Sequence, residues 1–136
     1  MKQKYEECVR WKQRFENFEK AFFRLKEAIE LKEPSELKRN GIVQRFEFTN
    51  EVAWKTLKDF LEEKEFNFKP SPKETIRLAQ QSGYINYAQE LMDGLELRNE
   101  LSLDYSGQKF LQLEYQLRTS IYPVIEKLYF FLKSEL

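Results

Sequence analysis

The chain has 136 residues, of which 41% are hydrophobic and 15% are aromatic, so it can bury the core of one domain. Its 23 basic and 23 acidic residues cancel, which leaves no bulk positive charge for binding duplex DNA or an anionic membrane. The single cysteine, Cys8, excludes an internal disulfide and is typical of a reducing cytoplasm. No apolar run approaches the roughly 20 residues of a membrane span, and the N-terminus lacks the apolar core of a signal peptide. We therefore expect one cytoplasmic domain over residues 1–136.

The sequence contains no histidine. This removes the side chain that most often acts as a general base near neutral pH, and also the commonest metal ligand. One cysteine supplies no zinc-binding cluster, and the sequence has no D-x-D pair and no glycine-rich phosphate loop. We therefore expect no independent catalysis, no metal site and no cofactor.

Helical periodicity dominates the first half of the chain. A first helix is predicted over residues 4–32, and Glu33-Pro34 should end it because proline disfavours helix in the residue before it. A second helix follows, and its start is open: Ser35 is a good cap, whereas Asn40-Gly41 is a good breaker. Residues 66–70 are predicted to be a linker. The apolar stripes of these two helices are Phe15, Phe18, Phe22, Leu25 and Ile29, and then Ile42, Phe46, Ala53, Leu57 and Phe60.

The second half begins with the clearest helix start in the chain. Ser71 can cap, Pro72 suits the first helical position and Glu74 completes a capping box, while Gly83 should end this short helix. A fourth helix is predicted over residues 87–101, with a turn over 102–107. The last helix starts near residue 108, and Pro123 should kink it and free a carbonyl near Thr119. These elements predict an all-α, up-and-down antiparallel helical bundle of four main helices plus a short one.

Two polar segments are candidates for function. Residues 44–57 mix ionic, polar and aromatic side chains, and Glu47 and Glu51 share one helix face because they are four residues apart. Residues 98–105, RNELSLDY, cover the end of the predicted fourth helix and the start of the turn after it. Each segment also has a purely structural interpretation: aromatic core residues with solvated charges in the first, and a helix C-terminus with its turn in the second.

Four segments of the chain, in order, resemble one protein family: RWKQRFENFEKA, QRFEFTNEVAWKTLKDFLE, SPKETIRLAQQSGYI and RNELSLDY. This family is the nucleotidyltransferase substrate-binding proteins, which belong to the HEPN superfamily of helical bundles. The resemblance implies a subunit that docks on a separately encoded minimal nucleotidyltransferase. It also implies a homodimer that carries two transferase chains.

HEPN proteins often carry an Arg followed, after four to six residues, by a His, and this motif is tied to ribonuclease activity in dimeric toxins. Here the matching Arg is Arg98, its polar follower is Asn99, and Leu103 stands where the His would fall. Leucine cannot transfer a proton, so this departure argues against ribonuclease activity. Tyr105 matches a tyrosine that the partner transferase modifies with a nucleotide in toxin-type relatives.

Residue chemistry gives a candidate groove between the second and fourth helices. Arg98 can bind phosphate or carboxylate, Trp54 can stack on a base or pack on the bundle, and Glu47 and Asp93 could orient Arg98. The structural alternative is a Glu47–Arg98 pair inside the bundle with Trp54 in the core. The predicted groove residues are Arg45, Glu47, Trp54, Lys55, Asp93, Arg98, Asn99 and Tyr105.

Three functions remain open at this point. The first is a non-catalytic partner of a minimal nucleotidyltransferase that helps to present a nucleotide or acceptor substrate. The second is a HEPN ribonuclease toxin, controlled by the transferase as antitoxin, which the missing histidine disfavours. The third is a structural helical adaptor whose exposed aromatic side chains only mediate assembly.

Overall fold

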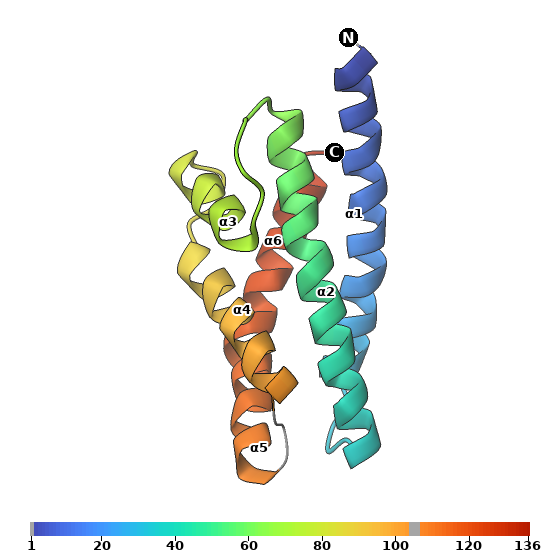
Figure 1. The fold of residues 1–136 in the computed structure, drawn as a ribbon. Helices are drawn as coiled ribbons and strands as arrows, with labels where there is room; N and C mark the ends of the chain where they lie inside the picture. The colour runs from blue at the N-terminus through green and yellow to red at the C-terminus, as the bar shows by residue number, and fades with distance from the viewer. Residues whose placement is uncertain (1, 104–106) are drawn as a thin grey trace.

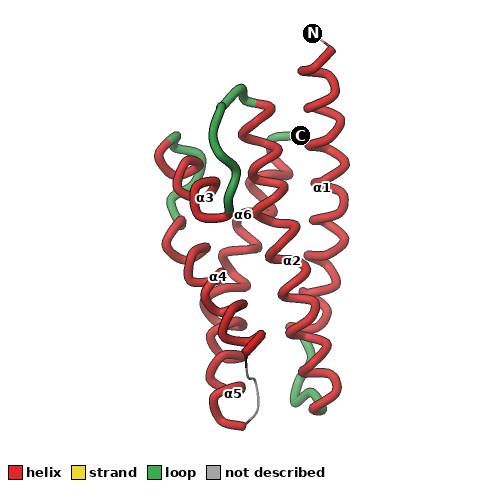
Figure 2. The backbone as a smooth tube through the Cα atoms, in the orientation of Figure 1, coloured by secondary structure: helices red, strands yellow, loops and turns green. Residues whose placement is uncertain are grey.

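The computed structural model describes residues 2–103 and 107–136, and helices make up most of this part of the chain (Figures 1 and 2). The ranges described contain no β-strand, which confirms the predicted all-α bundle. The elements are α1 (Lys2–Ile29), α2 (Glu36–Glu63), α3 (Pro72–Gln81), α4 (Ala88–Leu103), α5 (Gly107–Gln116), a π-helical turn (Leu117–Ile121) and α6 (Tyr122–Ser134). The last three of these follow one another without a break and correspond to the single last helix predicted from the sequence.

The long helices run alternately up and down (Figure 1). α1 and α2 form an antiparallel pair, α4 lies beside α2, and α6 packs against α1, α2 and α4. At the centre, the ring of Tyr129 is fully buried and stacks on Phe22, with 4.5 Å between ring centroids, and on Phe15. Its hydroxyl donates a hydrogen bond to Glu19. The aromatic face of α1 that helical periodicity predicts thus packs against α6.

The connection between α1 and α2 shows which start signal acts. α1 ends at Ile29, three residues before the predicted boundary, and Glu33 takes a left-handed backbone conformation with φ of 48°. Ser35 then caps α2, because its hydroxyl oxygen accepts from the backbone N–H of Lys38 at 3.3 Å. Gly41 lies inside the helix, so it does not break α2.

The start and end of α3 agree with the sequence. Ser71 caps the helix by accepting from the backbone N–H of Glu74 at 3.2 Å. Gly83 follows the helix with φ of 83°, a conformation that glycine adopts without steric cost. The side chain of Gln80, near the end of α3, accepts from the backbone N–H of Ala88 at 2.9 Å and so caps the first turn of α4. One short helix therefore fixes where the next one begins.

The end of α4 departs from the predicted boundary, and a π-helical turn precedes Pro123. α4 continues through Leu103, so Ser102 and Leu103 are helical and not part of a turn. Pro123 follows a π-helical turn in which the backbone N–H of Tyr122 reaches the carbonyl of Leu117. The Thr119 hydroxyl donates to the Tyr115 carbonyl at 2.8 Å. The chain accommodates the proline by widening one turn.

Within the described ranges, no helix is long and apolar enough to cross a membrane.

Candidate functional site

The facing edges of α2 and α4 carry a polar cluster centred on Glu51. Its Oε1 lies 3.1 Å from Lys55 Nζ, and its Oε2 accepts a hydrogen bond from Trp54 Nε1 at 3.3 Å. The guanidinium of Arg98 on α4 lies 3.8 Å from the same Oε2. We call Glu51, Trp54, Lys55 and Arg98 the Glu51 cluster. It joins three of the predicted groove residues around a carboxylate that the prediction did not include.

Burial alone would raise the pKa of Glu51, but its neighbours have the larger effect. Hydrogen bonds from Lys55 and Trp54, and the positive charges of Lys55 and Arg98, lower the pKa below its usual value. Glu51 therefore stays ionised at neutral pH and holds two cations near one point. Two positive charges share one negative charge, so the cluster carries net positive charge.

Both cations remain accessible. The side chains of Lys55 and Arg98 are 38% and 40% exposed, and among the described residues the guanidinium of Arg98 pairs only with Glu51, at 3.8 Å. A guanidinium of this kind can bind a phosphate or carboxylate through two parallel hydrogen bonds. The geometry of the Glu51 cluster thus suits an anionic group presented from outside the bundle.

Trp54 is half-buried and combines two roles. Its ring lines a small apolar cavity between α2, α4 and α6, together with Leu91, Leu95 and Leu128. Its indole N–H is directed to Glu51. The ring therefore packs on the bundle while its edge positions the carboxylate. This agrees with the packing alternative for Trp54 more than with free stacking on a base.

Three predicted residues lie away from the Glu51 cluster. Arg45 donates a hydrogen bond from Nη1 to the Arg24 carbonyl at 2.8 Å, so its side chain turns toward α1. Asp93 accepts from Gln89 Nε2 at 3.0 Å on the surface of α4. Glu47 forms no ion pair with any residue in the described ranges. Among these residues, neither Asp93 nor Glu47 orients Arg98.

The structure describes the segment after Arg98 as far as Leu103. Asn99 is exposed, and its backbone carbonyl accepts from the Ser102 hydroxyl at 2.8 Å. Leu103, where the resemblance to HEPN proteins would place a histidine, ends α4 and is 85% exposed. Tyr105 lies outside the described residues.

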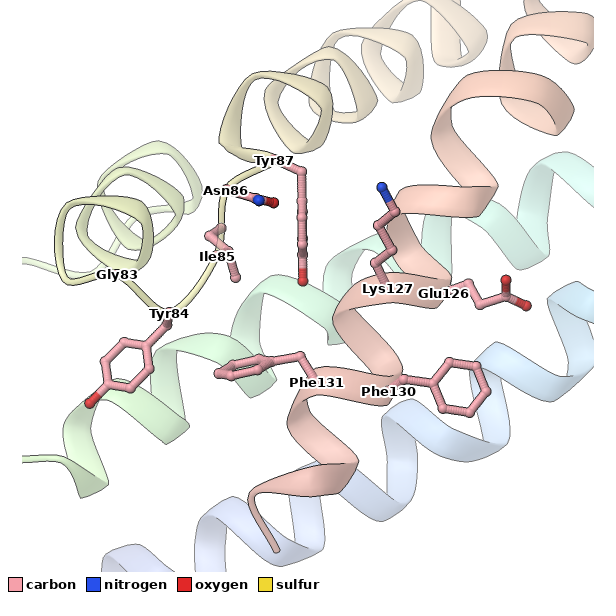
Figure 3. Close-up of a pocket in the computed structure, with 9 residues that line it drawn as sticks. All are labelled: Gly83, Tyr84, Ile85, Asn86, Tyr87, Glu126, Lys127, Phe130 and Phe131. Atoms are coloured by element: carbon pink, nitrogen blue, oxygen red, sulfur yellow. The ribbon is translucent and has the colours of Figure 1, made fainter.

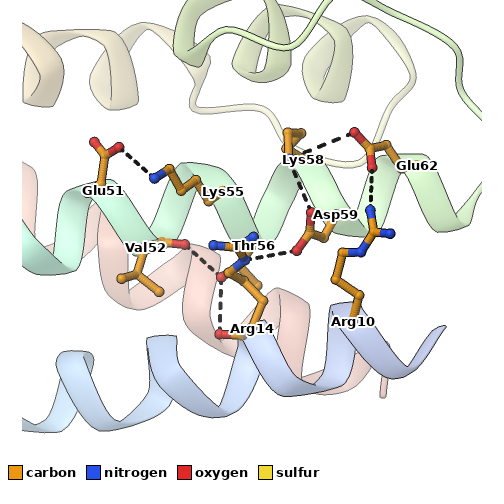
Figure 4. A network of polar contacts seen from close by, with 9 residues as sticks. All are labelled: Arg10, Arg14, Glu51, Val52, Lys55, Thr56, Lys58, Asp59 and Glu62. Atoms are coloured by element: carbon orange, nitrogen blue, oxygen red, sulfur yellow. Dashed lines mark hydrogen bonds and ion pairs between the residues drawn. The ribbon is translucent and has the colours of Figure 1, made fainter. Parts of the chain in front are cut away.

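A second polar row links α2 to α1 (Figure 4). Asp59 is only 2% exposed, and its Oδ2 accepts from Arg14 Nε at 2.9 Å, while Lys58 Nζ lies 3.5 Å from Oδ1. The Thr56 hydroxyl donates to the backbone carbonyls of Val52 and Arg14. These groups face one another between the two helices, so the row fixes the pairing of α1 and α2. Its carboxylate is not available to a ligand.

Sequence reasoning noted Glu51 only as a partner of Glu47 on one helix face. A stronger signal was present, since Glu51 precedes Lys55 by four residues, the favourable order for a helical ion pair. No spacing rule could have joined Arg98 to it, because that contact depends on how α4 packs beside α2. No group of three or more potential metal-ligating side chains occurs in the part of the chain that the structure describes.

Comparisons with known proteins agree with this architecture. Residues 13–134 match the family model described as "Nucleotidyltransferase substrate binding protein like". The crystal structure of ttk003001694 from Thermus thermophilus is similar, with a TM-score of 0.71 and 31% sequence identity. The similarity covers 87% of this chain and 97% of that one. No curated protein matches this sequence. The family match covers most of the chain and confirms the resemblance seen in the four sequence segments: this protein belongs to the nucleotidyltransferase substrate-binding family.

Proposed function

We propose that this protein is a non-catalytic subunit that associates with a separately encoded minimal nucleotidyltransferase. The observation that carries the proposal is the family match over residues 13–134. The Glu51 cluster supports it by supplying two half-exposed cations where an anionic group can approach. The lack of histidine supports the assignment of the chemistry to the partner. In this proposal the chain helps to present a nucleotide or an acceptor substrate.

The resemblance to HEPN proteins supports one further part of the proposal, the assembly. In that superfamily the helical subunit pairs with itself, so we expect a homodimer that carries two transferase chains. Light scattering after size-exclusion chromatography measures the mass of the free protein and the mass of its complex with the transferase. A monomer at all concentrations, free and in complex, contradicts this part and leaves the association with the transferase open.

The primary test is co-purification of this chain with the minimal nucleotidyltransferase of the same genome. We expect a stoichiometric complex and, with ATP and magnesium, nucleotide transfer that the isolated chain does not perform. Absence of a complex, with both proteins folded, contradicts the proposal.

The role of the Glu51 cluster is tested by removing its charges one at a time. Arg98→Gln and Lys55→Gln should each weaken complex formation or transfer by about tenfold, as expected for loss of one charge-assisted contact. Arg77→Gln on α3 is the matched control, because Arg77 is exposed and pairs only with Glu74 among the described residues. If Arg98→Gln behaves like the control, the Glu51 cluster has only a structural role, and this result favours the structural adaptor hypothesis.

The intact mass of this chain after the transfer reaction distinguishes the partner-subunit proposal from the toxin hypothesis. The proposal expects no added mass. An added nucleotide that is absent in Tyr105→Phe makes this chain the target of the transferase, as in the toxin–antitoxin relatives. Leu103 at the histidine position argues against ribonuclease activity even then, and an RNA-cleavage assay checks that point.

A further inference from the structure

A second concave site lies where the connection between α3 and α4 passes over α6 (Figure 3). It has a volume of about 490 Å³, within the usual range for small-molecule pockets. None of its lining residues belongs to the Glu51 cluster. The residues that matter here are Tyr84, Asn86, Tyr87, Lys127, Phe130 and Phe131.

The ring of Tyr87 forms a wall of this pocket. Figure 3 shows it between the side chains of Ile85 and Asn86 on one side and Lys127 on the other. The ring is half-buried, and its hydroxyl is buried without a hydrogen-bond partner in the part of the chain described. Burial raises the pKa of Tyr87 to about 12, so the phenol is neutral at physiological pH. The hydroxyl end of the ring is buried, and the face turned toward Lys127 gives the pocket an aromatic surface.

Lys127 supplies the only lysine or arginine charge among the pocket residues. Its ammonium lies 6.0 Å from the centroid of the Tyr87 ring, at the limit of a cation–π contact. It forms no ion pair with any carboxylate of the described residues, and Figure 3 shows the carboxylate of its neighbour Glu126 directed away from it. Lys127 is exposed and its four-carbon stem is flexible, so its charge can move to meet an anion at the pocket rim.

Apolar and amide groups complete the pocket. Phe131 lies between Tyr84 and Tyr87 in Figure 3, and its ring is 6.1 Å from that of Tyr84. The exposed amide of Asn86 stands beside the Tyr87 ring and can donate or accept at the edge of a bound ring. The pocket thus offers aromatic surface, an adaptable amide and the positive charge of Lys127, while the carboxylate of Glu126, which also lines the pocket, is directed away from that charge.

We propose that this pocket binds a small planar aromatic molecule that carries one anionic group, with its ring against Tyr87 and its phosphate or carboxylate on Lys127. Nucleoside monophosphates and aromatic carboxylic acids share this chemistry. The inference goes beyond the proposed function, because it concerns a separate site and needs no transferase. Its failure therefore leaves the partner-subunit proposal untouched, and the reverse also holds.

The test is calorimetric titration of the full chain with four probes: AMP, adenosine, ribose 5-phosphate and indole-3-acetate. Saturable binding of AMP or of indole-3-acetate supports the inference. The affinities of these two probes show whether the pocket prefers a nucleoside monophosphate or an aromatic carboxylic acid. Adenosine lacks the charge and ribose 5-phosphate lacks the ring, so each should bind at least about tenfold more weakly than AMP if AMP is the preferred ligand.

Variants then assign the site. Lys127→Gln and Tyr87→Leu should each weaken binding of the preferred probe by about tenfold, through loss of the charge and of the stacking face. Tyr87→Phe keeps the ring and loses only an unpartnered hydroxyl, so its affinity should stay within about twofold. Lys109→Gln on α5 is the control for charge alone, and circular dichroism checks that each variant is folded. The inference is overturned if no probe saturates at millimolar concentration, or if Tyr87→Leu and Lys127→Gln bind like the unmodified chain.

Discussion

Two glycines inside helices should respond to alanine in opposite directions. At Gly41 in α2, an added Cβ meets no atom within 4 Å, so alanine brings only its helical preference, about 0.5–1 kcal/mol. At Gly94 in α4, the added Cβ would lie 3.2 Å from Cγ2 of Ile121 in the π-helical turn. Carbon atoms pack at about 3.5–4.0 Å, and overpacking a core typically costs about 1–3 kcal/mol. We therefore expect Gly41→Ala to stabilise the protein and Gly94→Ala to destabilise it by about 1 kcal/mol net.

Thermal and urea unfolding, followed by circular dichroism, measure both changes. For a chain of this length about 1 kcal/mol corresponds to a shift of roughly 3–4 °C in Tm. In a double-mutant cycle, Ile121→Ala should remove the penalty at Gly94, since it deletes the atom that the new Cβ meets. The reasoning is refuted if Gly94→Ala stabilises the protein as much as Gly41→Ala does, or if the cycle is additive.

Three other substitutions test the packing and the polar contacts. Ser71→Ala should cost about 1 kcal/mol of unfolding free energy by removing the cap of α3, whereas Lys73→Ala, at an exposed position two residues later, should not. Arg14→Met should cost about 3 kcal/mol in urea unfolding, because it leaves the buried carboxylate of Asp59 with only Lys58; a cost below about 1 kcal/mol contradicts this account. Burial and the bond to Glu19 raise the pKa of Tyr129 to about 12, so this tyrosine stabilises the fold below pH 10 and loses that contribution between about pH 10 and 12. Tyr129→Phe should therefore show a smaller loss of stability over that range, and an unchanged loss would disprove the assignment.

The helices of this protein could be predicted because their signals are local. The aromatic stripe of α1 repeats at helical spacing, and Ser71 with Pro72 marks the start of α3, so neither depends on distant residues. The start of α2 stayed open because Ser35 and Gly41 gave opposite local signals. Burial of Ile42 and Val43 beside Gly41 holds that turn helical despite the glycine.

The candidate site could be predicted only in part, since its contacts join separate helices. The chemistry of Trp54, Lys55 and Arg98 makes them candidates, and the packing of α4 beside α2 brings them to one carboxylate. The same packing leaves Arg45 on the α1 side, although it lies in the same sequence motif. The pocket around Tyr87 had no sequence signal at all, because Lys127 comes from a helix 40 positions later and carries no motif.

The widened turn at Leu117–Ile121 bears on which length changes the chain can accept. In a regular α-helix each residue rotates the chain by about 100°, so deleting one residue turns everything that follows onto another face. A π-helical turn already holds one residue more than an α-helical turn needs. A single deletion between Leu117 and Ile121 can therefore be absorbed by tightening this turn, and α6 keeps Leu128 and Tyr129 directed at the core. Among α5, the π-helical turn and α6, this turn is therefore where the chain can lose one residue and keep the same face of α6 toward the core.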